Sequence, residues 1–321
     1  MLTRRSLVGT LALGATGARS ALAQSTFPAR EITFVVPWNA GGSNDILARG
    51  LQPLLRERGV TLIVENQPGA TGAIGLRRVA TANADGYTLG MGTSSTLAYM
   101  AEGKTPLKNG QFTHIARVSI DPLMLLVPGS SPYKTIDDFL AHMKKNPGSV
   151  SIGTPGNYNL NHIFASMTAR AAGVGYINAP YTGGAKVITD LAGGQIQAAV
   201  LKPSESLGQL QQGLVRALGL FAEERLPQFP GVPTFKEHGY DVFPFGHVVQ
   251  MAYVVGPAKL PPEVRTKLVD AFSAAIQDQR FKDFADRNAF LIASLTGDAL
   301  MAEVDQIEQS IKVVAEKVFK S

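Results

Sequence analysis

Short apolar runs alternate along most of the chain with segments whose apolar residues recur at helical spacing. Continuous apolar runs of this length, rich in β-branched residues, are typical of strands that are buried on both faces. We expect such strands at residues 32–37, 61–66, 87–92, 123–128, 149–153, 176–180, 197–201, 215–220 and 248–255. The helical pattern predicts helices over residues 44–58, 74–82, 135–145, 160–172, 185–192 and 205–212.

The last part of the chain, from Pro262 onward, has a different pattern and is predicted to be helical throughout. Its final segment repeats apolar residues at steps of three and four, which places them on one helix face. That face consists of Leu300, Val304, Ile307, Ile311, Val314 and Val318. An amphipathic helix needs a packing partner, and we expect this one to pack on the N-terminal lobe.

The alternation of strands and helices predicts an α/β fold built from βαβ units with parallel sheets. A chain of 321 residues is long enough for two lobes. Turn-prone segments at 121–122 and 244–246 are the expected crossings between them. Lobe 1 then comprises residues 24–121 plus 247–321, and lobe 2 comprises 122–246. Two crossings of this kind form a hinge, with a ligand cleft between the lobes.

The first 23 residues have the pattern of a secretory signal peptide. Arg4 and Arg5 precede the apolar run 7–18, and Ala21-Leu22-Ala23 forms an A-x-A cleavage site. We expect cleavage after Ala23 and a periplasmic protein. The paired arginines leave both the general and the twin-arginine export routes open.

Composition narrows the class of protein further. Without the three arginines of the leader, the net charge falls from +5 to +2, and the charges form no basic stripe. We therefore expect no nucleic-acid partner. The chain contains no cysteine, which excludes disulfides, a lipid anchor and thiolate metal sites. A soluble monomer is the resulting expectation.

The strongest local signal for a ligand site follows the first strand. A glycine pair, Gly41-Gly42, joins the strand to a helix that begins near Ser43 and Asn44. Free backbone amides at a helix N-terminus bind anions, and glycine lets a ligand approach the main chain. Trp38 and Asn39 precede the pair, and the single tryptophan is placed to form one wall of a pocket. A plain capped turn is the alternative interpretation.

A second loop in the other predicted lobe has the same order of strand, small polar residues and helix. It contains Thr154, Gly156, Asn157 and Tyr158. Two such loops, one in each lobe, could bind the two ends of one ligand. Weaker candidates after other strands are Thr93, Ser94, Tyr181 and Lys202, where a helix cap or an ordinary exposed side chain is the alternative.

No catalytic motif stands out. The five histidines form no HxxxH or HExxH pair, and the chain has no GxSxG nucleophile elbow. The glycines of 69–75 are spaced GxxGxxG, which favours a tight strand-to-helix turn over a dinucleotide loop. We therefore predict no enzyme activity, no metal and no cofactor.

Taken in order, several motifs resemble those of one family across essentially the whole predicted mature chain. They are Val36–Asp45, Val64–Gly75, Asp85–Leu89, Pro147-Gly148, Gly153–Gly156 with His162, Pro180-Tyr181, Asp190-Leu191, Gly193-Gly194, Arg216–Leu218, Val232–Thr234 and Gly256–Ala258. In these motifs the chain resembles the extracytoplasmic solute-binding proteins of tripartite tricarboxylate transporters, the Bug family.

The resemblance implies a type II periplasmic-binding fold whose lobes close around a small organic acid and then engage membrane permease subunits. It also implies that one carboxylate lies at 38–44, with 154–158 closing over it. Ligands of relatives include citrate, dicarboxylates, acidic amino acids, aromatic carboxylates and nicotinate. Asn39, Tyr158 and Asn159 depart from the family pattern where the distal end of the ligand would lie, so the solute itself is not predicted.

Two other functions are alternatives to this prediction. The loaded protein could signal to the periplasmic domain of a sensor kinase, which the genomic neighbourhood would distinguish. An exported α/β hydrolase is the third class, and the missing nucleophile motif speaks against it.

Overall fold

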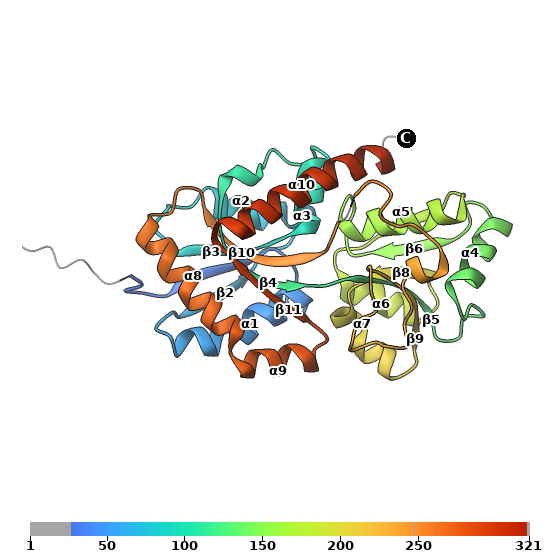
Figure 1. Cartoon of the computed structure of the whole chain (residues 1–321), viewed down its shortest axis with the longest axis horizontal. Helices are drawn as coiled ribbons and strands as arrows, with labels where there is room; N and C mark the ends of the chain where they lie inside the picture. The colour runs from blue at the N-terminus through green and yellow to red at the C-terminus, as the bar shows by residue number, and fades with distance from the viewer. Residues whose placement is uncertain (1–26, 247, 320–321) are drawn as a thin grey trace, which may run out of the picture.

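The computed structural model describes residues 27–246 and 248–319, which form two α/β lobes side by side (Figure 1). The predicted signal peptide at 1–23 lies outside the described residues. Each lobe contains one twisted sheet with helices packed against it, and this arrangement confirms the predicted fold class.

The first lobe is built on a six-stranded sheet in the order β11-β4-β10-β3-β1-β2. The strands are β1 (Ile32–Val36), β2 (Leu62–Asn66), β3 (Thr88–Thr93), β4 (Phe112–Ile120), β10 (Met251–Pro257) and β11 (Leu291–Thr296). Its helices are α1 (Ser43–Arg56), α2 (Ala73–Ala80), α3 (Ser94–Ala101), α8 (Pro262–Gln277), α9 (Gln279–Arg287) and α10 (Gly297–Phe319).

The second lobe is built on a five-stranded sheet in the order β7-β6-β8-β5-β9. The strands are β5 (Leu123–Pro128), β6 (Ser151–Thr154), β7 (Ile177–Pro180), β8 (Ala198–Leu201) and β9 (Val215–Phe221). Its helices are α4 (Ile136–Lys145), α5 (Leu160–Ala172), α6 (Gly184–Ala192) and α7 (Pro203–Gln211). All six residues of β5 are buried, as its continuous apolar run predicts.

The chain passes between the sheets twice. It leaves the first sheet at the end of β4 and enters the second at β5, with only Asp121 and Pro122 between the two strands. It returns after β9 through a long segment of loops and a short 3₁₀ turn and rejoins the first sheet at β10. β10 lies antiparallel to β4, so the two connecting segments meet at adjacent strands.

The prediction of purely parallel sheets is wrong. β10 and β11 pair antiparallel with β4, and β5 pairs antiparallel with both β8 and β9. The βαβ alternation is real within each lobe, where β1 pairs parallel with β2 and β3, and β6 with β7 and β8. The strands that bring the chain into each lobe, β10 and β5, run against this direction, as does the edge strand β11, and both sheets are therefore mixed.

The end of the chain corrects a second prediction. Residues after Pro262 are not helical throughout, because β11 (Leu291–Thr296) forms an edge strand between α9 and α10. The predicted apolar face of the final helix is confirmed, since Leu300, Val304, Ile307, Ile311 and Val314 are buried. Helix α10 packs on α3 and β4 of the first lobe and also contacts α5 of the second.

Candidate ligand-binding site

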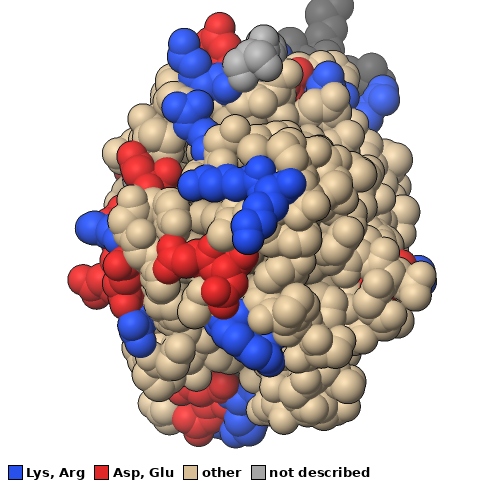
Figure 2. Space-filling model, turned by 90° about the vertical axis from the view of Figure 1, so that its right-hand side faces the viewer, with Lys and Arg blue, Asp and Glu red and all other residues tan. Residues whose placement is uncertain are grey.

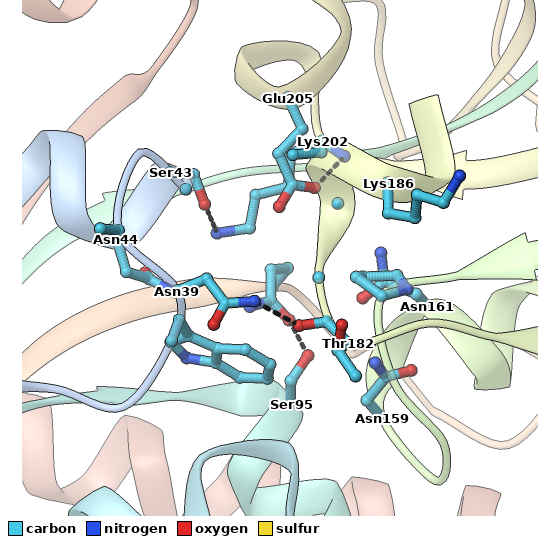
Figure 3. A pocket seen from close by; sticks show the side chains of 18 residues that line it. Asn39, Ser43, Asn44, Ser95, Asn159, Asn161, Thr182, Lys186, Lys202 and Glu205 are labelled. Carbon is cyan, nitrogen blue, oxygen red and sulfur yellow. Dashed lines mark hydrogen bonds between the residues drawn. The ribbon is translucent and has the colours of Figure 1, made fainter. Parts of the chain in front are cut away.

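A cavity of about 180 Å³ lies between the two lobes (Figure 3). It is smaller than the roughly 300–1,000 Å³ of sites for drug-sized molecules, so it suits a small solute. The first lobe lines it with Trp38, Asn39, Ala40, Gly42, Ser43, Asn44, Ser95 and Gln250. The second lobe lines it with Pro155, Asn159, Asn161, Thr182, Gly183, Gly184, Ala185, Lys186, Lys202 and Glu205.

The N-terminus of α1 faces this cavity without a side-chain cap. Gly42 is the N-cap residue and has no side chain that could bond the first amides of the helix. The first intrahelical bond runs from Ile46 N–H to Gly42 O, which leaves the N–H groups of Ser43 and Asn44 without a helix partner. Both residues line the cavity. Free amides and the positive end of the helix dipole together form an anion site.

Asp45 fixes the loop in front of α1 from behind. Its carboxylate is buried and accepts bonds from Gly41 N–H at 2.9 Å, from Arg49 Nε at 3.0 Å and from Asn66 Nδ2 at 3.0 Å. Burial alone would raise the pKa of Asp45, but these hydrogen bonds outweigh it and hold the pKa below its usual value. Gly41, at φ +76°, therefore gives its amide to Asp45 and does not line the cavity.

The N-terminus of α6 lines the same cavity from the second lobe and also lacks a side-chain cap. Its N-cap residue is Gly183, and Gly184 and Ala185 follow at the first helical positions. Two uncapped helix N-termini therefore point into one cavity from opposite lobes.

Helix α5, which follows the predicted second loop, is different. The Asn159 side chain caps it by accepting a hydrogen bond from His162 N–H at 2.9 Å. Thr154 is fully buried, and its hydroxyl donates to Gly156 O at 2.7 Å. Neither Thr154 nor the amides behind Asn159 are presented to the cavity in the way that those of α1 are.

Most of the predicted second loop lines a neighbouring cavity of about 630 Å³ instead. This outer cavity is lined by Gly156, Asn157, Tyr158 and Tyr181, together with residues 68–71 and Tyr99. The two cavities share Trp38, Asn39, Pro155 and Thr182, which form the wall between them.

Two hydrogen bonds join the lobes near this wall. Asn39 Nδ2 donates to Thr182 O at 2.9 Å, and Thr71 Oγ1 donates to Asn157 O at 3.1 Å. Figure 3 shows the Asn39–Thr182 bond crossing the cavity. The structure therefore has its lobes in contact across the cleft.

Trp38 lines both cavities. Its indole Nε1 is buried and has no hydrogen-bond partner among the described residues. A buried N–H of this kind costs free energy when it is unpaired.

Lys202 lies at the cavity, but it is buried rather than solvated. Its side chain is 5% exposed, its ammonium group donates to Ser43 Oγ at 3.2 Å, and it pairs with Asp121 at 3.4 Å. Asp121, 1% exposed, lies in the short segment between β4 and β5. Lys202 thus links the second lobe, the start of α1 and the crossing segment.

Thr93 and Ser94 are brought near the cavity but do not line it. Thr93 caps α3 by accepting from Thr96 N–H at 3.2 Å, and Ser94 Oγ accepts from Met251 N–H at 3.2 Å. The next residue, Ser95, does line the cavity, where its hydroxyl donates to Gln250 Oε1 at 2.9 Å.

Sequence reasoning missed several lining residues: Ser95, Asn161, Gly183, Gly184, Ala185, Glu205 and Gln250. One signal for part of this set was present. Gly183-Gly184 stands between a strand and a helix in the same way as Gly41-Gly42. The others come from distant segments, and no local pattern marks them.

Within residues 27–246 and 248–319, no cluster of histidine, aspartate and glutamate could hold a metal ion. None of the helices in the same ranges is both long and apolar enough to cross a bilayer.

Comparison with known proteins identifies the family of this chain. The family model described as tripartite tricarboxylate transporter family receptor matches residues 47–316. A UPF0065 protein from the gbd 5' region of Cupriavidus necator is 31% identical over 85% of this chain and 83% of its own length. Protein BugT of Bordetella pertussis is 28% identical over 98% of both chains.

Solved structures agree with the sequence relatives. The periplasmic binding protein BugD superposes with a TM-score of 0.82 at 28% identity, covering 91% of this chain and 99% of its own. MatC from Rhodopseudomonas palustris with bound malate superposes with a TM-score of 0.81 at 25% identity, covering 90% of this chain and all of its own. The family match extends over more than half of the sequence, and the chain therefore belongs to the tripartite tricarboxylate transporter receptor family of solute-binding proteins.

Proposed function

We propose that this protein is a periplasmic receptor that binds a small carboxylate between its lobes and presents it to the permease of a tripartite transporter. The observation that carries the proposal is the uncapped N-terminus of α1, whose Ser43 and Asn44 line the cavity between the lobes. The Lys202 ammonium group lies beside Ser43 and adds positive charge at the same place. Family membership supports the carboxylate class, as does the malate bound to MatC.

In this proposal the ligand carboxylate accepts hydrogen bonds from the amides of Ser43 and Asn44. The Trp38 side chain, which lines both cavities, forms one wall of the site. Gly183, Gly184 and Ala185 close over the ligand from the second lobe. Of the two predicted loops, the first makes the primary contact, while Gly156, Asn157, Tyr158 and Tyr181 form the outer cavity through which the solute enters.

Binding operates by hinge closure in this view. The hinge consists of the segments near 121–122 and 244–246, which divide the chain into 24–121 plus 247–321 and 122–246. A ligand shifts the lobes toward the closed state only by its differential affinity for that state. The Asn39–Thr182 and Thr71–Asn157 bonds belong to the closed state and add to that difference.

The remaining parts of the proposal concern the protein in the cell. It is exported with cleavage after Ala23, acts as a monomer and has no catalytic activity. Mass spectrometry of the exported protein should give a chain that begins at Gln24. A mature chain that keeps residues 1–23 would contradict the export step alone.

Tryptophan fluorescence tests the binding proposal directly, since Trp38 is the only tryptophan in the chain. Titration with C3–C6 mono- and dicarboxylates should change the emission for those acids that calorimetry shows to bind. The corresponding amides, which lack the charge, should leave it unchanged. Binding of neutral amides as tightly as of the acids would contradict a carboxylate site.

A further inference from the structure

Glu205 brings a second, negative group into the cavity. Its side chain lines the cavity wall next to Lys202, and Oε2 accepts a hydrogen bond from Lys202 N–H at 3.2 Å. No described residue donates a hydrogen bond to Oε1. In Figure 3 this second oxygen points toward the interior of the cavity.

Local structure fixes the position of this carboxylate. Glu205 is the third residue of α7, and its bond to Lys202 N–H is one half of a capping box. On its other side it packs against Gly184, where an added Cβ would stand 2.7 Å from Oε1. A side chain at position 184 would therefore displace the carboxylate. The carboxylate therefore stands in front of the N-terminus of α6 and occupies the place that a second ligand carboxylate would take.

The charges around Glu205 do not balance. Lys202 is the nearest cation, but Asp121 already pairs with it at 3.4 Å. Lys186 also lines the cavity, but its ammonium group pairs with Asp190 at 2.6 Å and is turned away from the interior (Figure 3). The cavity therefore contains one carboxylate more than it has cations to pair with. Removing a carboxylate from water without a cation beside it is costly, and a cation from the ligand would offset that cost.

The direction of the Glu205 titration agrees with this. Burial raises the pKa of Glu205, and Lys202 opposes the shift. An added positive charge nearby stabilises the ionised form of such a carboxyl group. A ligand with carboxylates at both ends would instead place a second negative charge next to it.

We propose that Glu205 is a specificity-determining residue that binds an ammonium group of the ligand, so that the receptor selects amino acids over plain carboxylic acids. The proposal rests on the function proposed above and names the substrate class of the same site. The backbone N–H of Lys202 donates to Glu205, and its ammonium group donates to Ser43. The place for the ligand ammonium group at Glu205 and the place for the ligand carboxylate at Ser43 are therefore neighbours. Adjacent ammonium and carboxylate groups, as in an α-amino acid, match this arrangement.

Calorimetry with three acids of one skeleton tests the proposal on the purified mature protein. Succinate, malate and aspartate differ only in whether C2 carries hydrogen, hydroxyl or ammonium, and glutarate, 2-hydroxyglutarate and glutamate extend the series by one carbon. Propionate, lactate and alanine test the monoacids. We expect the amino member of the series that fits to bind at least about tenfold tighter than the unsubstituted acid, the size of one charge-assisted hydrogen bond.

The Glu205→Gln variant should lose this preference. The glutamine oxygen can still accept from Lys202 N–H, so the capping box and the fold are retained. We expect the amino acid to bind at least about tenfold more weakly than to the parent protein, with the unsubstituted acid unchanged or tighter. Glu263→Gln, on the exposed start of α8, is the matched control and should change neither affinity.

Proton linkage gives a second readout that does not depend on the variant. Calorimetry in two buffers of different ionisation enthalpy should show no proton uptake when the amino acid binds. Tight binding of the plain acid with uptake of about one proton would mean that protonated Glu205 donates to a carboxylate, which overturns the proposal. Equal affinities for malate and aspartate would also overturn it, because a charged donor would not be required. If no acid of any series binds, it is the carboxylate function itself that fails.

Discussion

The N-termini of α1 and α5 have the same local order of strand, small polar residues and helix, yet they differ in what they can bind. At α1 the N-cap is Gly42, which has no side chain, and the first amides face the cavity. At α5 the N-cap is Asn159, whose side chain already accepts from His162 N–H. One helix end is left open for a ligand, and the other is closed by its own chain.

This difference shows what a strand-to-helix loop needs in order to bind an anion. Small polar residues are not sufficient, because asparagine, serine and threonine satisfy helix amides as readily as a ligand does. The informative residue is the one at the N-cap position. Glycine at this position in α1 and α6 leaves the amides free, whereas Thr93, Thr135 and Asn159 cap α3, α4 and α5.

The largest effect is expected from Lys202, which stands behind the open end of α1. Lys202→Met leaves the Asp121 carboxylate buried without its partner and should lower the free energy of unfolding by about 3–5 kcal/mol. Urea denaturation of the ligand-free protein measures this. The double variant with Asp121→Asn should recover most of the loss. Lys186→Met, at an exposed lysine of the same cavity, should cost at most about 0.5 kcal/mol.

A side-chain cap at the N-terminus of α1 should make it as unable to bind an anion as the N-terminus of α5. Gly42 has extended dihedral angles (φ −77°, ψ 166°), which suit an N-cap residue, so aspartate there can cap α1. Gly42→Asp should weaken carboxylate binding about 100-fold, since it removes charge-assisted bonds and adds a like charge. Thermal unfolding of the free Gly42→Asp protein should occur at a higher temperature than that of Gly42→Ala, because both carry a Cβ 3.1 Å from Asn39 O and only aspartate caps the helix. Gly42→Ala supplies a Cβ without a cap, and an equal loss of binding by that variant would attribute the effect to steric hindrance.

A fall in pH should destabilise the structure around the N-terminus of α5 and leave the N-terminus of α1 unchanged. The Nδ1 atom of His162 accepts from Tyr158 N–H at 3.2 Å, and burial lowers the pKa of His162 to about 4. The unfolded chain takes up this proton near pH 6.5, so the folded state loses stability as the pH falls from 6.5 toward 4. We expect a loss of about 1–2 kcal/mol between pH 7 and pH 5 from this residue.

Urea denaturation of the parent and of His162→Gln at both pH values checks this expectation. The variant should lose less stability on acidification, although His114 in the first lobe, whose pKa burial also lowers to about 4, adds its own dependence. His142→Gln on α4 serves as the control. An unchanged dependence in His162→Gln would show that His162 is not neutral in the folded protein.

The smallest effect is expected at the cap itself. Asn159→Ala removes the acceptor for His162 N–H and should lower the free energy of unfolding by about 1 kcal/mol. Asn159→Ser keeps a cap oxygen and should recover most of this loss. Equal stabilities of the alanine variant and the parent would mean that water or the loop satisfies the α5 amides, and the contrast with α1 would then be weaker than the geometry indicates.

Much of the fold could be predicted because its signals are local. The buried strands and the helices of the βαβ units follow from continuous apolar runs and helical spacing, and the apolar face of α10 follows from steps of three and four. β4 was missed because polar residues interrupt its apolar pattern, and β11 because its apolar residues lie within the segment predicted to be helical. Strand direction was misjudged where the chain crosses between lobes, because nothing in a strand sequence records the direction of its neighbours.

The family, the fold class and the glycine pair in front of α1 follow from the sequence alone, because their signals are motifs of residues close together in the chain. Which loops share a cavity depends instead on the tertiary structure. Ser43, Lys202 and Glu205 belong to two lobes, and Asp121 belongs to the segment between them; their distances depend on how the lobes close. The partners of a buried charged group depend in turn on those distances. The sequence left open that Lys202 is an ordinary exposed lysine, whereas the structure shows it paired with the buried Asp121. For the same reason Glu205 gave no signal in the sequence and became informative only beside Gly184.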